Sequence, residues 1–282
     1  MLSKTLSNTL TGMLSRTLSQ PVANTGDPLA AAWIALEEAA GYTFGAGEKA
    51  AVNTAFTDLR SNNLLTKVAR LQLLCMGSSA RNAIPLIGSG GSFMGGITHN
   101  TKSVTYNGST GVIDTNVNAS TCGWTDTNMH WGYYLAAVVG ADSSTLHGIA
   151  SGAAGTIQGS TRFSTLGSFA DFPTTSGTAR ISAASNGAKG VRSYHKYNTS
   201  SARITNYAGT QTVVASGAGL SSTGVVLPSL SLYVGARNNL GSADLFTSET
   251  HSALWACSGM TTTDNDVFDV ILYNLVTAFG AN

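Results

Sequence analysis

Alternation of apolar and polar positions is the main signal in the second half of the chain, and it is clearest over Leu230–Asn239. One side carries Leu230, Leu232, Val234 and Ala236, while the other carries Ser231, Tyr233, Gly235 and Arg237. A period of two predicts a β-strand with one face on a core. The polar cluster that follows predicts a turn, and we expect Arg237 to brace a neighbouring loop.

Short segments of this kind recur from residue 84 almost to the C-terminus, separated by turns rich in Gly, Asn and Ser. They predict strands at residues 103–106, 111–114, 130–139, 145–150, 155–163, 178–183, 190–197, 202–207, 211–215, 229–236 and 252–258. Asn-Gly pairs at 107–108 and 186–187 favour hairpins. Many short strands with regular turns indicate a β-sandwich or jelly roll.

Helical spacing appears before and after this region. Asp27-Pro28 predicts a helix start, and Gly41 predicts its end. We expect this helix to bury one apolar stripe, namely Leu29, Trp33, Leu36 and Ala40. A second helix is predicted over about 47–60, with Val52, Ala55, Phe56 and Leu59 inward.

A closing helix is predicted near the C-terminus. Thr263 and Asp266 resemble a capping box at its start, and Gly280 ends it. Its predicted inward residues are Val267, Val270, Ile271, Leu275 and Ala278. Capping also explains Asp264-Asn-Asp266, which lacks the rest of a calcium-binding EF-hand loop.

The first twenty residues contain an internal repeat. Met1-Leu-Ser-Lys-Thr-Leu-Ser is followed, twelve positions later, by Met13-Leu-Ser-Arg-Thr-Leu-Ser. The apolar residues that form its stripe are Leu2, Leu6, Leu10, Met13, Leu14 and Leu18. Two interpretations are open: a loose tail, as termini often are, or an assembly arm that docks on a partner or on sister chains. We favour the arm, so the predicted organisation is an arm (1–26), a small helical unit (27–80) and a sandwich with a closing helix (81–282).

Composition narrows the possible partners. Only 10% of the 282 residues are charged, the net charge is +1, and Lys and Arg do not cluster, so nucleic-acid binding is not expected. No run approaches the ~20 apolar residues of a membrane-spanning helix, and the first residues lack a secretory signal pattern. Three widely spaced cysteines, Cys75, Cys122 and Cys257, predict buried free thiols and folding in a reducing cytoplasm.

The sequence contains none of the common catalytic motifs. Retaining glycosidases need two carboxyl groups about 5–5.5 Å apart; Glu249 is the only glutamate after Glu48, and Asp142, Asp171 and Asp244 show no matching spacing. The histidines His99, His130, His147, His195 and His251 show no metal-binding motif, so hydrogen-bonded or exposed strand histidines are expected. No nucleophile elbow or phosphate-binding loop occurs. We therefore predict no catalytic residues, no metal and no cofactor.

Aromatic residues on predicted strands and loops are the remaining candidates for binding: Trp124, Trp131, Tyr133, Tyr134, Tyr194, Tyr197 and Tyr207. They could stack on sugars, although aromatic residues in strands more often fill cores.

Four segments, taken together and in order, resemble the concanavalin A-like (laminin-G-like) jelly-roll proteins of tailed-phage and prophage virions. They are Val52–Val68, Ser103–Thr115, Leu232–Asn239, and the final strand with its Gly259 turn and helix. The resemblance covers about residues 27–282 and implies a virion structural protein, made in the bacterial cytoplasm. It would be a capsid decoration, head fibre or tail fibre subunit that binds other virion proteins through residues 1–26 as a homo-oligomer. The alternatives are a receptor- or glycan-binding lectin module of the virion and a polysaccharide depolymerase.

Overall fold

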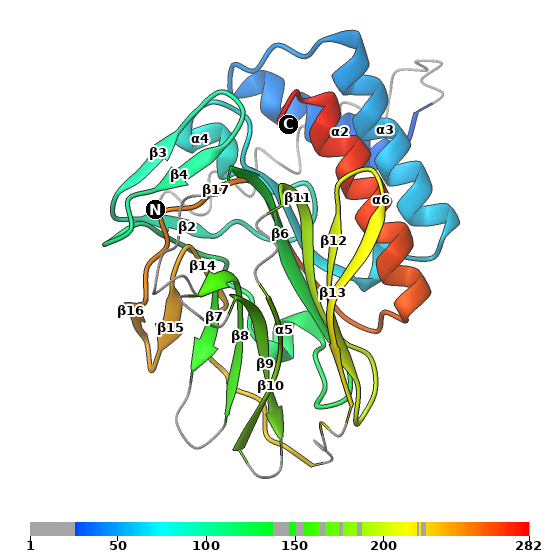
Figure 1. Cartoon of the computed structure of the whole chain (residues 1–282). Helices are drawn as coiled ribbons and strands as arrows, with labels where there is room; N and C mark the ends of the chain where they lie inside the picture. Colours follow the sequence, from blue (N-terminus) through cyan, green and yellow to red (C-terminus); the bar gives the residue numbers. More distant parts are fainter. Residues whose placement is uncertain are drawn as a thin grey trace.

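Two β-sheets packed face to face form the body of the molecule, and helices cover the outer face of one sheet (Figure 1). The computed structural model describes residues 26–137, 147–150, 155–163, 167–174, 177–184, 188–218, 220 and 224–281. The predicted arm residues Leu2, Leu6, Leu10, Met13, Leu14 and Leu18 lie outside these ranges. The mainly-β sandwich with a small helical N-terminal part is confirmed.

Sheet A has eight strands and is antiparallel throughout. Its order is β13 (Gln211–Gly217), β12 (Ala202–Tyr207), β11 (Gly190–Lys196), β6 (Met129–Ala137), β17 (Thr250–Cys257), β4 (Val104–Tyr106) and β3 (Ile97–His99), with β1 (Val68–Leu73) also paired to β17. β6 and β17 occupy the centre, where both faces are covered and nearly every residue is buried.

Sheet B has nine strands. Its order is β10 (Gly177–Ala183), β9 (Gly167–Thr174), β8 (Thr156–Phe163), β7 (His147–Ala150), β14 (Tyr233–Val234), β5 (Val112–Asp114) and β2 (Ser92–Met94). β15 (Arg237–Asn239) pairs in parallel with β7 and antiparallel with β16 (Ser242–Asp244).

Three longer helices, α2 (Pro28–Ala39), α3 (Ala46–Ser61) and α6 (Thr262–Ala278), pack outside sheet A (Figure 1). Shorter turns of helix are η1 (Leu65–Lys67), α4 (Ser79–Asn82) and α5 (Ala119–Cys122). None of the helices in the described ranges is long and apolar enough to cross a membrane.

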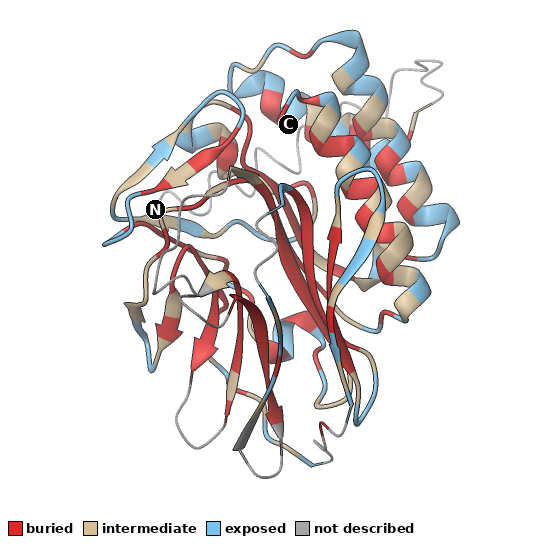
Figure 2. Cartoon of the chain, in the orientation of Figure 1, coloured by how far each residue is buried: buried red, intermediate tan, exposed pale blue. Residues whose placement is uncertain are grey.

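Sheet A separates two main hydrophobic cores, and Figure 2 shows its central strands buried. Toward the helices, side chains such as Trp255 pack against Phe56 and Phe268. Toward sheet B, side chains such as Trp131 and Tyr194 pack against Phe172. The three cysteines are free and buried, as the sequence predicted.

The strand predicted over residues 229–236 is wrong in extent. Only Tyr233–Val234 (β14) and Arg237–Asn239 (β15) are strands. Gly235 separates them at φ +95°, and a Cβ there would lie 2.3 Å from the Tyr106 ring. The chain therefore turns at Gly235, although the apolar alternation continues through it.

The Asn107-Gly108 turn does not close a hairpin within one sheet. It carries the chain from β4 in sheet A to β5 in sheet B. The Asn107 Oδ1 atom accepts backbone N–H groups of Ser109, Thr110 and Gly111 at 2.9–3.0 Å, which fixes this crossing. The other predicted Asn-Gly turn lies outside the described residues.

Two helix predictions need correction. α2 buries Ala30, Trp33 and Glu37, whereas Leu29 and Leu36, predicted inward, are exposed. The α6 capping box consists of Thr261 and Asp264, two residues before the predicted pair. The predicted inward face of α6 is confirmed in part: Ile271 and Leu275 are buried, Val267 and Val270 are half-buried, and Ala278 is exposed. The buried face also includes Phe268, Asp269 and Leu272, which were not predicted.

Candidate functional site

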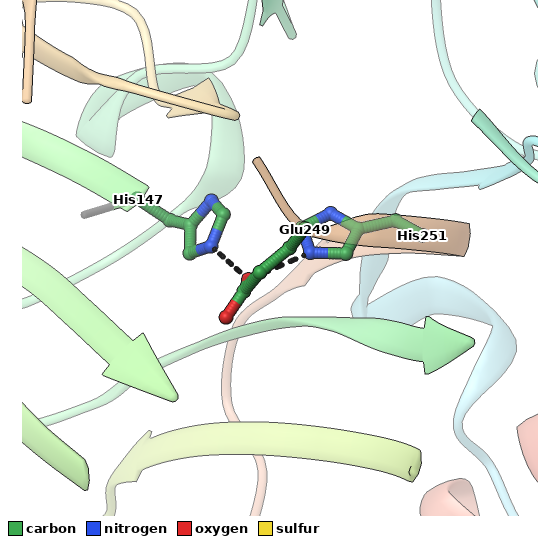
Figure 3. Close-up of side chains that lie close together, drawn as sticks. All are labelled: His147, Glu249 and His251. Carbon is green, nitrogen blue, oxygen red and sulfur yellow. Dashed lines mark hydrogen bonds and ion pairs between the residues drawn. The ribbon is translucent and has the colours of Figure 1, made fainter. Parts of the chain in front are cut away.

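A cluster of His147, Glu249 and His251 lies in the interior between the two sheets (Figure 3). His147 begins β7 of sheet B, while Glu249 and His251 come from the start of β17 in sheet A. Glu249 and His251 are two residues apart, so an extended strand places both on one side. The Nε2 atoms of His147 and His251 lie 3.1 and 3.0 Å from the same oxygen, Oε2 of Glu249.

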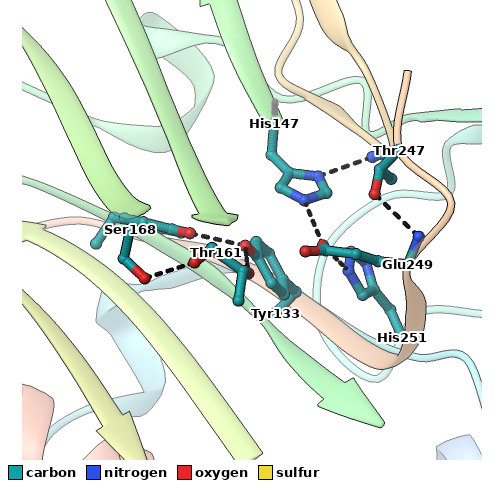
Figure 4. Close-up of polar contacts among 9 residues, drawn as sticks. Tyr133, His147, Thr161, Ser168, Thr247, Glu249 and His251 are labelled. Atoms are coloured by element: carbon teal, nitrogen blue, oxygen red, sulfur yellow. Dashed lines mark hydrogen bonds and ion pairs between the residues drawn. The ribbon is translucent and has the colours of Figure 1, made fainter. Parts of the chain in front are cut away.

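Backbone contacts set the orientation of His147 (Figure 4). The N–H group of Gly235 donates a hydrogen bond to Nδ1 of His147 at 2.9 Å. Gly235 is held in turn because its carbonyl accepts the N–H group of Thr247. With Nδ1 acting as an acceptor, neutral His147 carries its proton on Nε2, which points at Glu249.

Glu249 is the charged partner in its contact with His251 at neutral pH. Burial favours protonated Glu249, but hydrogen bonds from His147 and His251 outweigh it and lower the pKa of Glu249 to about 2. Burial lowers the pKa of His251 to about 4, despite its hydrogen bond to Glu249. Glu249 is therefore ionised and His251 neutral near pH 7.

Two imidazoles and a carboxylate are a donor set that several transition metals accept, and their ligand atoms lie within 4.8 Å of one another. The geometry around His147 opposes this use. A metal on Nε2 would require the ring proton on Nδ1, where it would face the N–H group of Gly235. The residues therefore fit a hydrogen-bonded link between the sheets better than a metal site.

A second polar link joins the sheets beside the first (Figure 4). The Tyr133 hydroxyl on β6 lies 2.5 Å from Oγ1 of Thr161 on β8 and 2.7 Å from the Tyr194 hydroxyl on β11. The Tyr133 ring stacks on His251, with ring centroids 4.3 Å apart. All these side chains are buried, so the cluster and its neighbours form one enclosed polar network within the sandwich.

The sequence analysis considered Glu249 and each histidine separately, and it did not predict that His147, Glu249 and His251 form one cluster. His147 and Glu249 are 102 positions apart and lie in different sheets, so the packing of sheet B on sheet A brings them together. The Glu-x-His spacing at 249 and 251 was the visible signal, because it places both side chains on one strand face.

The other predicted carboxylates are engaged elsewhere. The two carboxylate oxygens of Asp171 accept hydrogen bonds from Nε and Nη2 of Arg180, each at 2.7 Å. Oδ2 of Asp171 also accepts a hydrogen bond from the Gln158 side chain. Asp244 forms a similar pair with Arg237, at 2.7–2.8 Å, so Arg237 braces the neighbouring strand β16. Asp142 lies outside the described residues.

Of the remaining histidines, His195 and His99 have hydrogen-bond partners, as predicted, whereas His130 is fully buried and neither of its ring nitrogens has a partner among the described residues. His195 lies 3.0 Å from the Met260 carbonyl, and His99 lies 2.9 Å from Asn82. His130 packs between the His195 and Phe268 rings. Among the predicted aromatic candidates, Trp131, Tyr133, Tyr134 and Tyr194 are at most 2% exposed, which confirms their core interpretation.

A surface hollow of about 480 Å³ lies where α5 meets residues 224–229. Its lining combines apolar and hydroxyl groups with one carboxylate: Ala119, Ser120, Trp124, Thr125, Asp126, Gly224, Val225, Leu227, Pro228 and Ser229. Trp124 is oriented because its indole N–H donates to the Cys257 carbonyl at 2.8 Å. The Gly224 N–H donates to Asp126 at 2.6 Å and connects the two walls.

No protein-family model and no curated protein sequence matches this chain. Among solved structures, it is similar to domain 4 of AbnA, a GH43 extracellular arabinanase from Geobacillus stearothermophilus, in complex with arabinotriose. That likeness has 10% identity and a TM-score of 0.42, and it covers 72% of this chain and 98% of that domain.

Two further structures are similar at the same general level. The botulinum neurotoxin serotype C1 binding domain is 10% identical, with a TM-score of 0.38 over 73% of this chain and 51% of that one. An arabinofuranosidase complexed with arabinofuranosyl-alpha-1,2-xylobiose is 13% identical, with a TM-score of 0.37 over 75% and 43%. The chain thus spans about half or less of these two proteins. No functional residue is transferred from any of the three structures.

Proposed function

We propose that this chain is a non-catalytic structural module of a bacteriophage virion, attached through residues 1–26. One observation carries the non-catalytic part: Glu249 is enclosed, its Oε2 atom joins sheet A to sheet B through His147, and the same atom is also bound by His251 of its own strand segment. The virion part rests on the ordered resemblance of residues 27–282 to jelly-roll virion proteins.

Two other buried charged side chains, Asp269 and Arg70, also form hydrogen bonds that link separate parts of the fold, and this supports a structural role. Asp269 of α6 accepts hydrogen bonds from Ser193, Thr205 and Gln211 on three adjacent strands of sheet A. Arg70 of β1 donates to the carbonyl groups of Ser89 and Thr115. Such internal links suit a rigid building block whose contacts with partners lie on its surface.

The test is to locate the protein in purified particles of the phage that encodes it. We expect mass spectrometry to detect the full chain in the particles, and a version lacking residues 1–26 to fold but not to be incorporated. Absence of the full chain from particles would overturn the virion assignment. Normal incorporation of the shortened chain would overturn the role of the arm.

A second function, saccharide binding, is favoured by the hollow beside Trp124. Apolar surface from Trp124 and Leu227 suits the C–H face of a sugar, while Ser120, Asp126 and Ser229 offer polar partners for its hydroxyl groups. We expect the Ser229→Trp variant, which fills the hollow, to lose binding on an array of bacterial surface glycans. Ser200→Trp, at another exposed serine, is the matched control. Absence of binding by the wild-type chain, or binding that survives Ser229→Trp, would exclude this site.

A further inference from the structure

The outer face of α2 is apolar, although it is exposed to solvent. A surface helix normally buries its apolar stripe and exposes its charges. Here Leu29 and Leu36 are 47% and 44% exposed, while Glu37 is buried. Ala32 and Ala35 are also exposed between the two leucines. The exposed side of α2 is therefore an almost continuous apolar stripe, of the kind that marks an interaction surface.

The fold does not need these two leucines. Ala30 and Trp33 supply the contacts of α2 with the core beneath it. Trp33 also lies within reach of the Ile84 carbonyl, at 3.4 Å through its indole N–H group. Because Ala30 and Trp33 already pack α2 on the core, Leu29 and Leu36 are available to contact another segment or another molecule.

The N-terminal repeat has the chemistry to cover this stripe. Its apolar positions recur every few residues, and the two units begin twelve residues apart, which is the length of α2. Charge does not oppose this contact: Lys4 and Arg16 are the only charged side chains in residues 1–26, while Glu37 of α2 is buried and Glu38 is paired with Lys49. Each repeat unit carries one of the two cations.

The number of repeat units points to a second copy of the chain. Two units with the same pattern should recognise the same kind of surface, yet one chain contains one α2. At least one unit must therefore bind α2 of another copy. A net charge of +1 gives little electrostatic repulsion between copies.

We infer that one of the two repeat units in residues 1–20 of one copy docks on the outer face of α2 of a second copy, at Leu29 and Leu36, and so joins the chains into a homo-oligomer. This inference refines the arm in the proposed function, but it does not depend on the protein being found in a particle. Its tests use the purified chain alone.

The main experiment measures the oligomeric state of the full chain by light scattering across a dilution series. We expect the wild-type chain to self-associate, and Leu29→Ser with Leu36→Ser to weaken self-association about tenfold or more, because each lost leucine contact removes buried apolar area. The matched control is Val213→Ser with Leu240→Ser, two apolar residues that are 52% and 70% exposed elsewhere on the surface. These control changes should leave association unaltered.

A second measurement separates the arm from other contacts. A synthetic peptide of residues 1–20 should bind the chain that lacks residues 1–25, and it should not bind the same chain with both leucines replaced. The core residues that the structure describes run from Ala30 to Ala281, so this shortened chain keeps all of them. A monomeric full chain, or association and peptide binding that survive the leucine changes, would overturn the inference. Detection of the protein in particles tests the proposed function independently.

Discussion

The backbone N–H group of Gly235 donates a hydrogen bond to Nδ1 of His147 at 2.9 Å. This contact fixes the proton of neutral His147 on Nε2, toward Glu249, and it joins the β14–β15 turn to β7. The position of one proton thus decides between a metal site and a hydrogen-bonded link.

Replacing Glu249 with Gln should destabilise the fold. Both histidines contact the same oxygen, so a glutamine carbonyl placed there would still accept from both, but the amide is neutral and the two charge-assisted hydrogen bonds would become weaker neutral ones. We expect a loss of about 2–4 kcal/mol in the free energy of unfolding, measured by urea denaturation. Glu38→Gln is the control, because the exposed Glu38–Lys49 pair should contribute less than about 1 kcal/mol. Unchanged stability in the Glu249 variant would contradict the role of this link.

Transition metals should not stabilise the protein through this cluster. We expect the melting temperature to be the same after chelator treatment and after addition of zinc, because His147 offers Nε2–H and not a lone pair. A zinc-dependent rise in melting temperature that disappears in His147→Gln would show that the metal reorganises the site. His99→Gln is the control, because His99 lies outside the cluster. If the zinc-dependent rise persists in His99→Gln, the effect belongs to His147 and is not a general effect of removing a histidine.

A methyl group at Gly235 should be far more harmful than one at Gly241. Both glycines have a positive φ, +95° and +94°, so alanine meets similar backbone strain at each, about 1–2 kcal/mol. At Gly235 the new Cβ would also lie 2.3 Å from the Tyr106 ring, whereas nothing lies within 4 Å at Gly241. We expect Gly235→Ala to lower the melting temperature much more than Gly241→Ala. Equal effects would mean that the Tyr106 contact is unimportant.

Stability should depend on pH through Asp269. Burial raises the pKa of Asp269 to about 6 from 3.8, although hydrogen bonds from Ser193, Gln211 and Thr205 oppose the rise. Between these values the folded state keeps a proton that the unfolded state has released. The stability contributed by that proton is complete below pH 3.8, and it is lost as the pH rises through about 6.

Asp269→Asn removes this titration. The variant should therefore gain stability relative to the wild-type chain as the pH rises from about 4 to about 7, by on the order of 3 kcal/mol. The comparison must be differential, because neutral His251, with its pKa near 4, makes both proteins less stable as the pH falls from 6.5. A constant difference between variant and wild type across this range would show that Asp269 does not titrate as expected.

Local pattern predicted much of this fold because most strands here alternate or carry clear turn residues. It failed where the backbone departs from a regular strand. Leu230–Ala236 kept its apolar alternation across Gly235, and only contact with Tyr106 reveals the turn. β9 was missed because Pro173 and a Gly-Ser start obscure its strand pattern.

The candidate site was less accessible to prediction than the fold. His147 and Glu249 meet through the packing of two sheets, and no local period encodes that contact. Leu29 and Leu36 were predicted to face inward, and this was wrong. Helix α2 has two apolar faces, and helical spacing alone does not show which of them packs on the core. Trp33 and Ala30 took the inner positions, and the leucines remained outside.

The three enclosed thiols also affect the chemical durability of the protein. Burial raises the pKa of Cys75 to about 12, and it also raises the pKa of Cys122 and of Cys257 above the usual thiol value. Oxidants and disulfides react with the thiolate, which is scarce at neutral pH in such surroundings. The folded chain can therefore pass from a reducing to an oxidising medium without forming covalent crosslinks or losing its packing.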